Sequence, residues 1–235
     1  GRVTALAVRN DILYLGGSFS YVGPPTGGGA PLDGLTGSPT SSPHVAGRVN
    51  AAVPDGNGGW YIGGEFSQAG GAPRTNLAHV LPDGSVDSWS PTTNYRVYDL
   101  ALSGSTVYLA GDFSQVNGQS RPQLAAVDAT SGALLSWNSG LGTGSSVSGL
   151  AATESVLYVC GSFTSIGGQP RNRLAALDLA TGNATPWNPN ANGSVSTVVV
   201  SDSLVYVGGS LTGIGPRARN NLAAIDQVTG AATNW

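Results

Sequence analysis

A short phrase recurs five times along this chain at a nearly constant interval, and this repetition limits the possible folds more than any other feature. It reads YLGGSFS from residue 14, YIGGEFS from 61, YLAGDFS from 108, YVCGSFT from 158 and YVGGSLT from 206. The five tyrosines are 47, 47, 50 and 48 residues apart, and a series of four tryptophans keeps the same interval. Five repeats of about 48 residues therefore account for the whole chain without a linker.

Each repeat contains four short segments with the character of strands, separated by turn residues and one longer loop. In the last repeat, apolar runs at 193–200 and 204–209 precede a loop, which leads to NLAAID at 221–226 and AATNW at 231–235. Such a repeat is typical of the blades of a β-propeller. We predict an all-β protein, a five-bladed β-propeller with four antiparallel strands per blade. The prediction treats residues 1–235 as a single domain, with blades at about 1–46, 47–93, 94–144, 145–192 and 193–235.

The composition narrows the range of partners. Charged residues make up 10% of the chain, against about 25% on average, and the formal net charge is −3 without a basic cluster. No apolar stretch reaches the length of a membrane span, and a lone cysteine cannot form an internal disulfide. We therefore expect no nucleic-acid partner and no insertion into a membrane.

Motifs that carry catalysis are missing from the sequence. The chain has no lysine, and it lacks the patterns G-x-S-x-G, H-E-x-x-H and C-x-x-C of serine hydrolases, zinc proteases and redox sites. With 13 acidic residues, the chain could still contain the pair of carboxylates that a glycosidase uses. We predict that the protein is not an enzyme and uses no metal and no cofactor, with a hydrolase as the least favoured alternative.

Several repeated residues have structural interpretations. An aspartate opens the turns DATSG, DLATG and DQVTG, where its carboxylate is expected to accept hydrogen bonds from its own turn. Cys160 replaces small residues of the other repeats, so we interpret it as a buried structural residue. The repeated tryptophans could be stacking platforms for sugars or side chains that dock neighbouring blades, and we favour docking. These tryptophans are Trp89, Trp137, Trp187 and Trp235.

The predicted topology places the longer loops on one face of the propeller. In a four-stranded antiparallel blade, the loop after the second strand and the link after the fourth emerge together. This long-loop face receives residues 67–76, 114–123, 164–173 and 212–221, and loops held by a rigid scaffold are frequent binding sites. We predict that its ligand-binding residues are Arg74, Asn76, Arg121, Gln123, Arg171, Asn172, Arg219 and Asn220.

The four arginines of this face share one repeated position and allow two interpretations. Each could pin its own loop by bonding backbone carbonyls or an acid such as Glu65 or Asp112, or together they could offer bidentate contacts to carboxylate or phosphate groups. We favour pinning, because residues repeated in every unit usually serve the repeat. The first repeat departs from the pattern, with Thr26 at the arginine position and His44 in a Gly/Pro-rich segment that we interpret as an exposed loop.

The repeat YVCGSFTSIGGQPRNRLAALDLATGNATPWNPNANG and its counterparts resemble the bacterial delta-60 repeat propellers of large secreted or surface proteins. The resemblance covers all five repeats and is weakest in the middle of the first. It implies a propeller in an extracellular setting and no particular ligand. The segment LAALDLATGNATPW is also similar to quinoprotein-type propeller repeats, whose tryptophan docks one blade on the next. Lectins of the tachylectin type are similar only in blade number and repeat length.

These observations predict a non-enzymatic recognition or adhesion module, secreted or at the bacterial cell surface. It would be lectin-like and would bind glycans or cell-surface proteins through the long-loop face, with weak single sites that gain avidity by repetition. The alternative is a structural repeat domain of a larger surface protein, without a small-molecule site. The chain is expected to act as a monomer or as a domain of a larger chain, and a closed ring and a fragment of a longer propeller both remain open.

Overall fold

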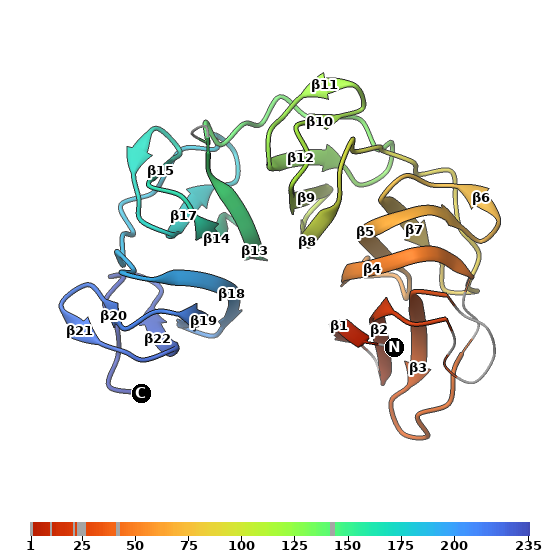
Figure 1. Cartoon of the computed structure of the whole chain (residues 1–235), viewed down its shortest axis with the longest axis horizontal. Coiled ribbons are helices and arrows are strands. Elements are labelled where there is room, and N and C mark those ends of the chain that lie inside the picture. The colour runs from red at the N-terminus through yellow and green to blue at the C-terminus, as the bar shows by residue number, and fades with distance from the viewer. Residues whose placement is uncertain (1, 10, 21, 23–26, 41–42, 142–143) are drawn as a thin grey trace. The chain divides into compact units, whose positions relative to one another are not determined.

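The computed structural model describes residues 2–9, 11–20, 22, 27–40, 43–141 and 144–235. Each sequence repeat forms an antiparallel sheet whose three main strands follow one another in chain order, with the second strand in the middle (Figure 1). In the described part of the chain all regular structure is β, and no helix there could cross a membrane.

The strands of the first two repeats are β1 (Arg2–Arg9), β2 (Ile12–Ser18), β3 (Gly29–Asp33), β4 (Val45–Pro54), β5 (Trp60–Ala69), β6 (Ala72–Pro73) and β7 (Leu77–Val80). The third repeat contains β8 (Val97–Ser103), β9 (Thr106–Gly111), β10 (Gln115–Val116), β11 (Gln119–Ser120) and β12 (Leu124–Asp128). The fourth contains β13 (Ser146–Ala152), β14 (Val156–Ser162), β15 (Ser165–Ile166), β16 (Gln169–Pro170) and β17 (Leu174–Asp178). The fifth contains β18 (Ser194–Ser201), β19 (Leu204–Ser210), β20 (Gly213–Ile214), β21 (Arg217–Ala218) and β22 (Leu222–Asp226).

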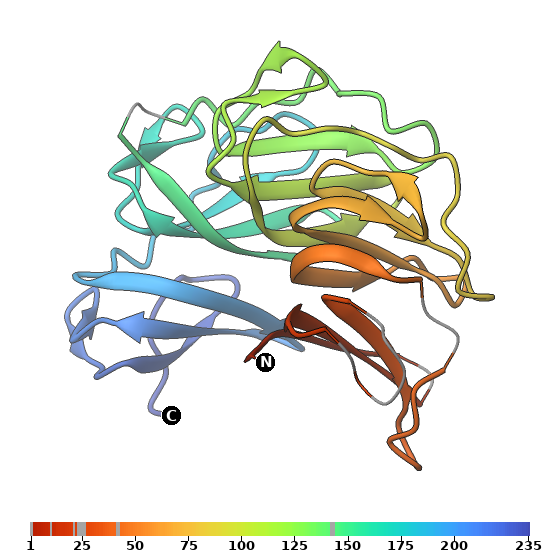
Figure 2. The same ribbon diagram turned by 45° about the vertical axis from the view of Figure 1, so that its right-hand side comes forward.

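The chain divides into two compact units. The N-terminal unit comprises Gly1–Arg121 with Val127–Leu134 and contains most of the first three repeats. The C-terminal unit comprises Pro122–Ala126 with Leu135–Trp235 and contains the last two. Within the N-terminal unit, β4 packs against β1 and β2, so that the first two sheets lie side by side (Figure 2).

The third strands are apolar on both faces. In β17 the four residues from Leu174 to Leu177 are all buried, although their side chains alternate between the two sides of the sheet. One side meets the fifth repeat, since Cys160 and Leu174 belong to the same apolar core as Val195 and Val198. Cys160 is fully buried in this core, which confirms its interpretation as a buried structural residue.

The paired glycines of the repeated phrase allow close contact between sheets and within them. A Cβ atom on Gly63 would lie 2.8 Å from Cγ1 of Val97, the first valine of the following repeat. A Cβ on Gly161 would overlap the carbonyl oxygen of Ser146, at the bulge where β13 and β14 shift register. The missing side chain of the first glycine therefore lets the next sheet pack closely, and that of the second leaves room for the β-bulge.

The repeated tryptophans Trp89 and Trp187 each join their repeat to the next, whereas Trp235 is 60% exposed. Trp187 is buried, packs edge to face on Tyr158 of its own repeat at 5.0 Å, and donates its indole N–H to the carbonyl of Asp226 at 2.9 Å. Trp89 makes the equivalent bond to the carbonyl of Asp128 at 3.0 Å. These contacts confirm the docking interpretation.

The turn aspartates also behave as predicted. The Oδ1 atom of Asp178 accepts hydrogen bonds from the backbone N–H groups of Ala180 and Thr181 and from the Thr181 hydroxyl, at 3.1, 2.8 and 2.8 Å. The same pattern recurs at Asp33, Asp128 and Asp226.

The fourth segment of each repeat joins its sheet through one isolated bridge, such as Leu177 to Ala184 and Ile225 to Ala232. A single β-bridge is thus found where a fourth strand is predicted, and the number of four strands per blade stays a prediction. The sequence also gave no sign that the long loops contain hairpins of their own. Examples in the described residues are β10–β11, β15–β16 and β20–β21.

Candidate functional site

The loop arginines turn back into their own repeats. Arg171 is only 9% exposed, and it donates from Nη1 to the carbonyl of Pro170 at 2.7 Å and from Nη2 to the carbonyl of Thr185 at 2.6 Å. Because Thr185 lies two residues before Trp187, the guanidinium joins the long loop to the fourth segment of the same repeat. Equivalent carbonyl contacts join Arg74 to Pro73 and Asp87, Arg219 to Ala218 and Thr233, and Arg121 to Ser120.

This geometry agrees with the interpretation that the arginines pin their loops. Their partners are backbone carbonyls, whereas Asp112, an acid considered as a partner, bonds to Arg96. Binding of a ligand by the four arginines stays a prediction. Thr26, the residue at the arginine position of the first repeat, lies outside the described residues, and His44 is exposed as expected.

Asn76 is a buried residue that holds the link between the second and third repeats. Its φ of 67° lies in the left-handed region, which asparagine tolerates better than most residues. Its Nδ2 donates to the carbonyls of Thr93 and Tyr95 at 3.2 and 3.0 Å, and its Oδ1 accepts from the backbone N–H of Phe66 at 3.3 Å. Asn76 therefore positions the segment 93–95 instead of facing solvent.

The other predicted binding residues have separate surroundings. Asn172 donates to Oδ1 of Asn190 at 2.7 Å, and Asn220 is exposed. Gln123 has a left-handed backbone with φ of 65°, like Asn76, and its amide oxygen is buried without a hydrogen-bond partner among the described residues.

The link that Asn76 holds leads into a cluster of aromatic and charged side chains in the third repeat. Tyr95 is 59% exposed, Arg96 directly precedes β8, Tyr98 lies in β8, and Asp112 directly follows β9. We call these four residues the Tyr–Arg cluster. They meet at the long-loop end of the sheet because Val97 pairs with Gly111, and the backbone N–H of Asp112 donates to the carbonyl of Arg96 at 3.1 Å.

Two side chains of the Tyr–Arg cluster, Arg96 and Tyr98, converge on the carboxylate of a third, Asp112. Arg96 donates from Nε to Oδ2 of Asp112 at 2.9 Å, and the Tyr98 hydroxyl donates to the same oxygen. The guanidinium carbon of Arg96 lies 5.8 Å from the centre of the Tyr95 ring and 5.6 Å from that of Tyr98. Both distances are within the range of cation–π attraction.

Electrostatics fixes the protonation of this cluster. The hydrogen bond to Asp112, followed by the charges of Tyr98, Asp112 and Glu65, raises the pKa of Arg96 above its ordinary value. Burial first, and then the bond to Asp112, raises the pKa of Tyr98. At neutral pH the cluster therefore presents a charged guanidinium and a neutral phenol. In the described structure, Oδ1 of Asp112 has no protein partner and can meet a ligand. The guanidinium of Arg96 has five N–H donors, more than its contacts with Asp112 and Tyr98 use.

The Tyr–Arg cluster was missed by sequence reasoning that looked for residues shared by all repeats. At the positions of Arg96 and Asp112 the fourth repeat has Ser146 and Ser162, and the fifth has Ser194 and Ser210. The second repeat has Arg48 and Glu65 there, so the useful signal in the sequence was the pair of tyrosines in the run NYRVY.

A second polar cluster lies at the opposite end of the second repeat, with its histidine buried and one of its acids, Asp87, partly exposed. The ring of His79 is held between Oδ2 of Asp55 at 3.0 Å and Oδ2 of Asp87 at 2.8 Å, and it stacks on Tyr61 at 4.2 Å. His79 is only 8% exposed, so this cluster ties together a turn, β7 and the fourth segment. In the described residues no group of three or more acidic, histidine or cysteine side chains is arranged to hold a metal ion.

Comparison with known proteins supports a β-propeller repeat. A family model described as "Domain of unknown function (DUF5122) beta-propeller" matches residues 56–88 and 156–178. These segments run from the second strand toward the fourth segment of the second repeat, and over the second and third strands of the fourth. The chain thus contains repeats of the β-propeller kind, and the delta-60 repeat name stays a resemblance. No curated protein sequence matches the chain.

Solved structures of low sequence identity share the fold. A structure of the nidogen–laminin complex has a TM-score of 0.62 at 14% identity over 99% of this chain and 78% of the other. The WD40 domain of Neurospora crassa Pan2 has a TM-score of 0.53 at 12% identity over 99% of this chain and 78% of that domain. The WD40 β-propeller domain of Doa1 has a TM-score of 0.61 at 15% identity, over 95% of this chain and 63% of that chain. These similarities concern the propeller fold.

Proposed function

We propose that this protein is a non-enzymatic, five-bladed β-propeller with four-stranded blades that recognises glycans through its long-loop face. Five sequence repeats, each with a three-stranded meander and a bridged fourth segment, support the blade count. The observation that carries the proposed activity is the Tyr–Arg cluster. Its exposed ring of Tyr95 lies beside the guanidinium of Arg96, which is hydrogen-bonded to the carboxylate of Asp112, and both charged groups keep unused hydrogen-bonding atoms.

The chemistry of the Tyr–Arg cluster suits a sugar. The ring of Tyr95 offers an apolar platform for the C–H face of a pyranose. Oδ1 of Asp112 can accept hydrogen bonds from hydroxyl groups, and the Nη groups of Arg96 can donate to them. The charges of Arg96 and Asp112 compensate each other, so the cluster favours a neutral sugar over an ionic one. Bonds from Asn76 hold the backbone carbonyl of Tyr95 in place, which lowers the entropy lost on binding.

A glycan array followed by calorimetry of the best ligand tests this proposal. We expect Tyr95→Ala to weaken binding by about tenfold, since an aromatic contact is worth about 0.5–1.5 kcal/mol. Asp112→Asn should weaken it by about 10- to 100-fold, because hydrogen bonds to a charged group contribute about 1.5–3 kcal/mol. Neither change should unfold the protein, as Tyr95 is 59% exposed and the side chain of Asp112 is 34% exposed.

Two control variants change residues outside the Tyr–Arg cluster. Ser162→Ala changes the residue of the fourth repeat that corresponds to Asp112, and Leu35→Ala removes an 86%-exposed apolar side chain from a turn that the topology assigns to the other face. Both should bind like the unchanged protein. The proposal fails if no glycan binds, or if the ligand binds Tyr95→Ala as tightly as it binds the unchanged protein.

A structural repeat domain without a small-molecule site is the second candidate. The contacts between the repeated arginines and backbone carbonyls of their own repeats favour it, because these arginines hold their loops in place. Unfolding of Arg171→Gln together with an empty glycan array would support this candidate. An extracellular or cell-surface location and cell-surface partners are part of either proposal, and fractionation of the producing cells tests the location.

A further inference from the structure

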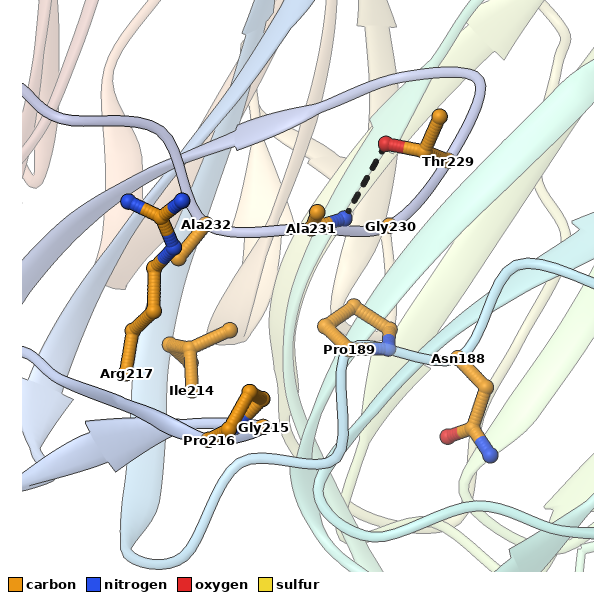
Figure 3. A pocket seen from close by; sticks show the side chains of 10 residues that line it. All are labelled: Asn188, Pro189, Ile214, Gly215, Pro216, Arg217, Thr229, Gly230, Ala231 and Ala232. Carbon is orange, nitrogen blue, oxygen red and sulfur yellow. Dashed lines mark hydrogen bonds between the residues drawn. The ribbon is translucent and has the colours of Figure 1, made fainter.

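A pocket separate from the proposed glycan site lies between the fifth repeat and the link that precedes it. A cavity of about 230 Å³ lies between the link at Asn188 and Pro189, the hairpin β20–β21 and the segment that follows β22 (Figure 3). All of its lining residues belong to the C-terminal unit, whereas the Tyr–Arg cluster belongs to the N-terminal one. The pocket is smaller than a drug-sized site, so it would suit a ligand of few atoms.

The corresponding space in the fourth repeat is closed. There the hairpin tip lies directly on the fourth segment, because Gly167 donates its N–H to the carbonyl of Ser139 at 2.6 Å and accepts from Ala184 at 2.9 Å. A Cβ atom on Gly167 would overlap the backbone nitrogen of Ala184. In the fifth repeat, by contrast, the nearest atom to a Cβ on Gly215 is the carbonyl oxygen of Pro189, at 3.5 Å.

The sequence of the hairpin explains this difference. The two tip residues of the fourth repeat, Gly167 and Gly168, have φ values of 61° and 74°, which suit a tight turn with two left-handed residues. The fifth repeat has Gly215 and Pro216 at these places, and the ring of proline holds φ near −65°. Pro216 therefore cannot form the same turn, and the tip no longer covers the fourth segment.

The lining of the pocket combines an apolar floor with one cation. Ile214 and Ala232 are buried below it at 1% and 5% exposure, and Pro189 and Pro216 add their rings. Arg217 stands exposed at one edge of the pocket (Figure 3). It takes the place of Gln169 in the fourth repeat, and it is the sole charged residue among the described residues that line the cavity.

The guanidinium of Arg217 keeps unused donors. Its Nη1 bonds to Oδ1 of Asn234, and its Nε and Nη2 have no protein partner in the part of the chain that the structure describes. A planar guanidinium with free N–H groups beside an apolar floor matches a ligand with a carboxylate at one end and a short hydrocarbon at the other. We propose that this pocket binds small organic carboxylates with a short apolar chain.

Titration of the ¹⁵N-labelled protein with butyrate, followed by amide NMR, tests the proposal. We expect saturable shifts at Gly215, Arg217 and Ala231, with a dissociation constant on the order of 1–10 mM, because so small a ligand has few atoms to contribute. Butyramide has the same shape without the charge and should bind about tenfold more weakly. Equal shifts from butyrate and butyramide, or no localised shifts with butyrate up to about 50 mM, would overturn the proposal.

Variants that exchange the two repeats sharpen the test. Arg217→Gln introduces the residue of the fourth repeat at an exposed position, and it should weaken butyrate binding by about tenfold without changing the rest of the spectrum. The double change Gly168→Pro with Gln169→Arg should create a second butyrate site, seen as new shifts at Ala184. Unchanged butyrate binding in Arg217→Gln would refute the role of this arginine. If that variant does not fold, the comparison of butyrate with butyramide decides the matter.

Discussion

The tryptophans at the junctions between repeats allow a quantitative test of how the repeats hold together. Trp187 is 4% exposed and packs on Tyr158, while its indole N–H donates to the carbonyl of Asp226 in the fifth repeat. Trp235 occupies the same position at the end of the fifth repeat and packs on Tyr206 at 5.3 Å, but it is 60% exposed. The two residues thus differ in burial and in the bond to a following repeat.

The structure sets the size of each effect. Trp187→Ala should lower the free energy of unfolding by about 3–5 kcal/mol, since it opens a cavity in a closed core. Trp187→Phe keeps most of the ring and loses one hydrogen bond, worth about 0.5–1.5 kcal/mol. The loss should be at the low end, because the carbonyl of Asp226 still accepts the N–H of Gly230 at 3.0 Å. For Trp235→Ala we expect about 1 kcal/mol or less, the value of an edge-to-face contact at an exposed site.

Urea unfolding followed by far-ultraviolet circular dichroism measures these differences, and it avoids tryptophan fluorescence, which the substitutions themselves change. The slope of the unfolding free energy against urea should stay constant across the variants, so that shifts in midpoint report stability. The reasoning is refuted if Trp235→Ala destabilises as much as Trp187→Ala. It is also refuted if Trp187→Phe is as damaging as Trp187→Ala.

Three further predictions follow from single contacts. Hydrogen bonds from the hydroxyl and then the backbone N–H of Thr181 lower the pKa of Asp178. This carboxylate therefore stabilises the fold above its unfolded pKa of about 4 and loses that contribution as the pH falls through its lower folded pKa. In an acid titration, Asp178→Asn should lose stability less steeply than the unchanged protein. Arg171→Lys should destabilise the protein by about 1–3 kcal/mol in thermal unfolding, because a lysine ammonium group lacks the two Nη groups with which the guanidinium bonds both carbonyls. Full stability of this variant would contradict the loop-pinning role. Gly167→Ala should lower the melting temperature more than Gly168→Ala, since both glycines have positive φ but only Gly167 lies against the backbone of Ala184, and equal losses would show that φ alone decides.

The candidate site lies on the long-loop face that the sequence predicts, but it is built from residues that the sequence analysis did not select. The long loops and links do meet at one end of each sheet, as the strand order requires. The arginines chosen there were the most regular polar residues, and regularity marks a contact that every repeat needs, as the bonds of Arg171 show. The Tyr–Arg cluster depends on two tyrosines that the third repeat alone has in the sequence, since the second repeat also places an arginine and an acid there, Arg48 and Glu65. Its members are separated by up to 17 residues, from Tyr95 to Asp112. Their meeting depends on the pairing of β8 with β9.

The sequence by itself determined the repeat, the three main strands of each sheet and the contacts of its repeated turn aspartates and junction tryptophans, because these depend on local patterns that recur along the chain. Alternating and continuous apolar runs define strands, an aspartate before a Thr-Gly pair defines a turn, and a regularly spaced tryptophan marks a junction. Tertiary structure alone decided which donors have acceptors. Arg171 is buried against carbonyls, whereas Arg217, at the place of Gln169, stands beside a pocket that the fourth repeat lacks. The physical reason is that a single proline at 216 changes the turn of a hairpin, and the effect appears only when that hairpin meets the fourth segment of its repeat.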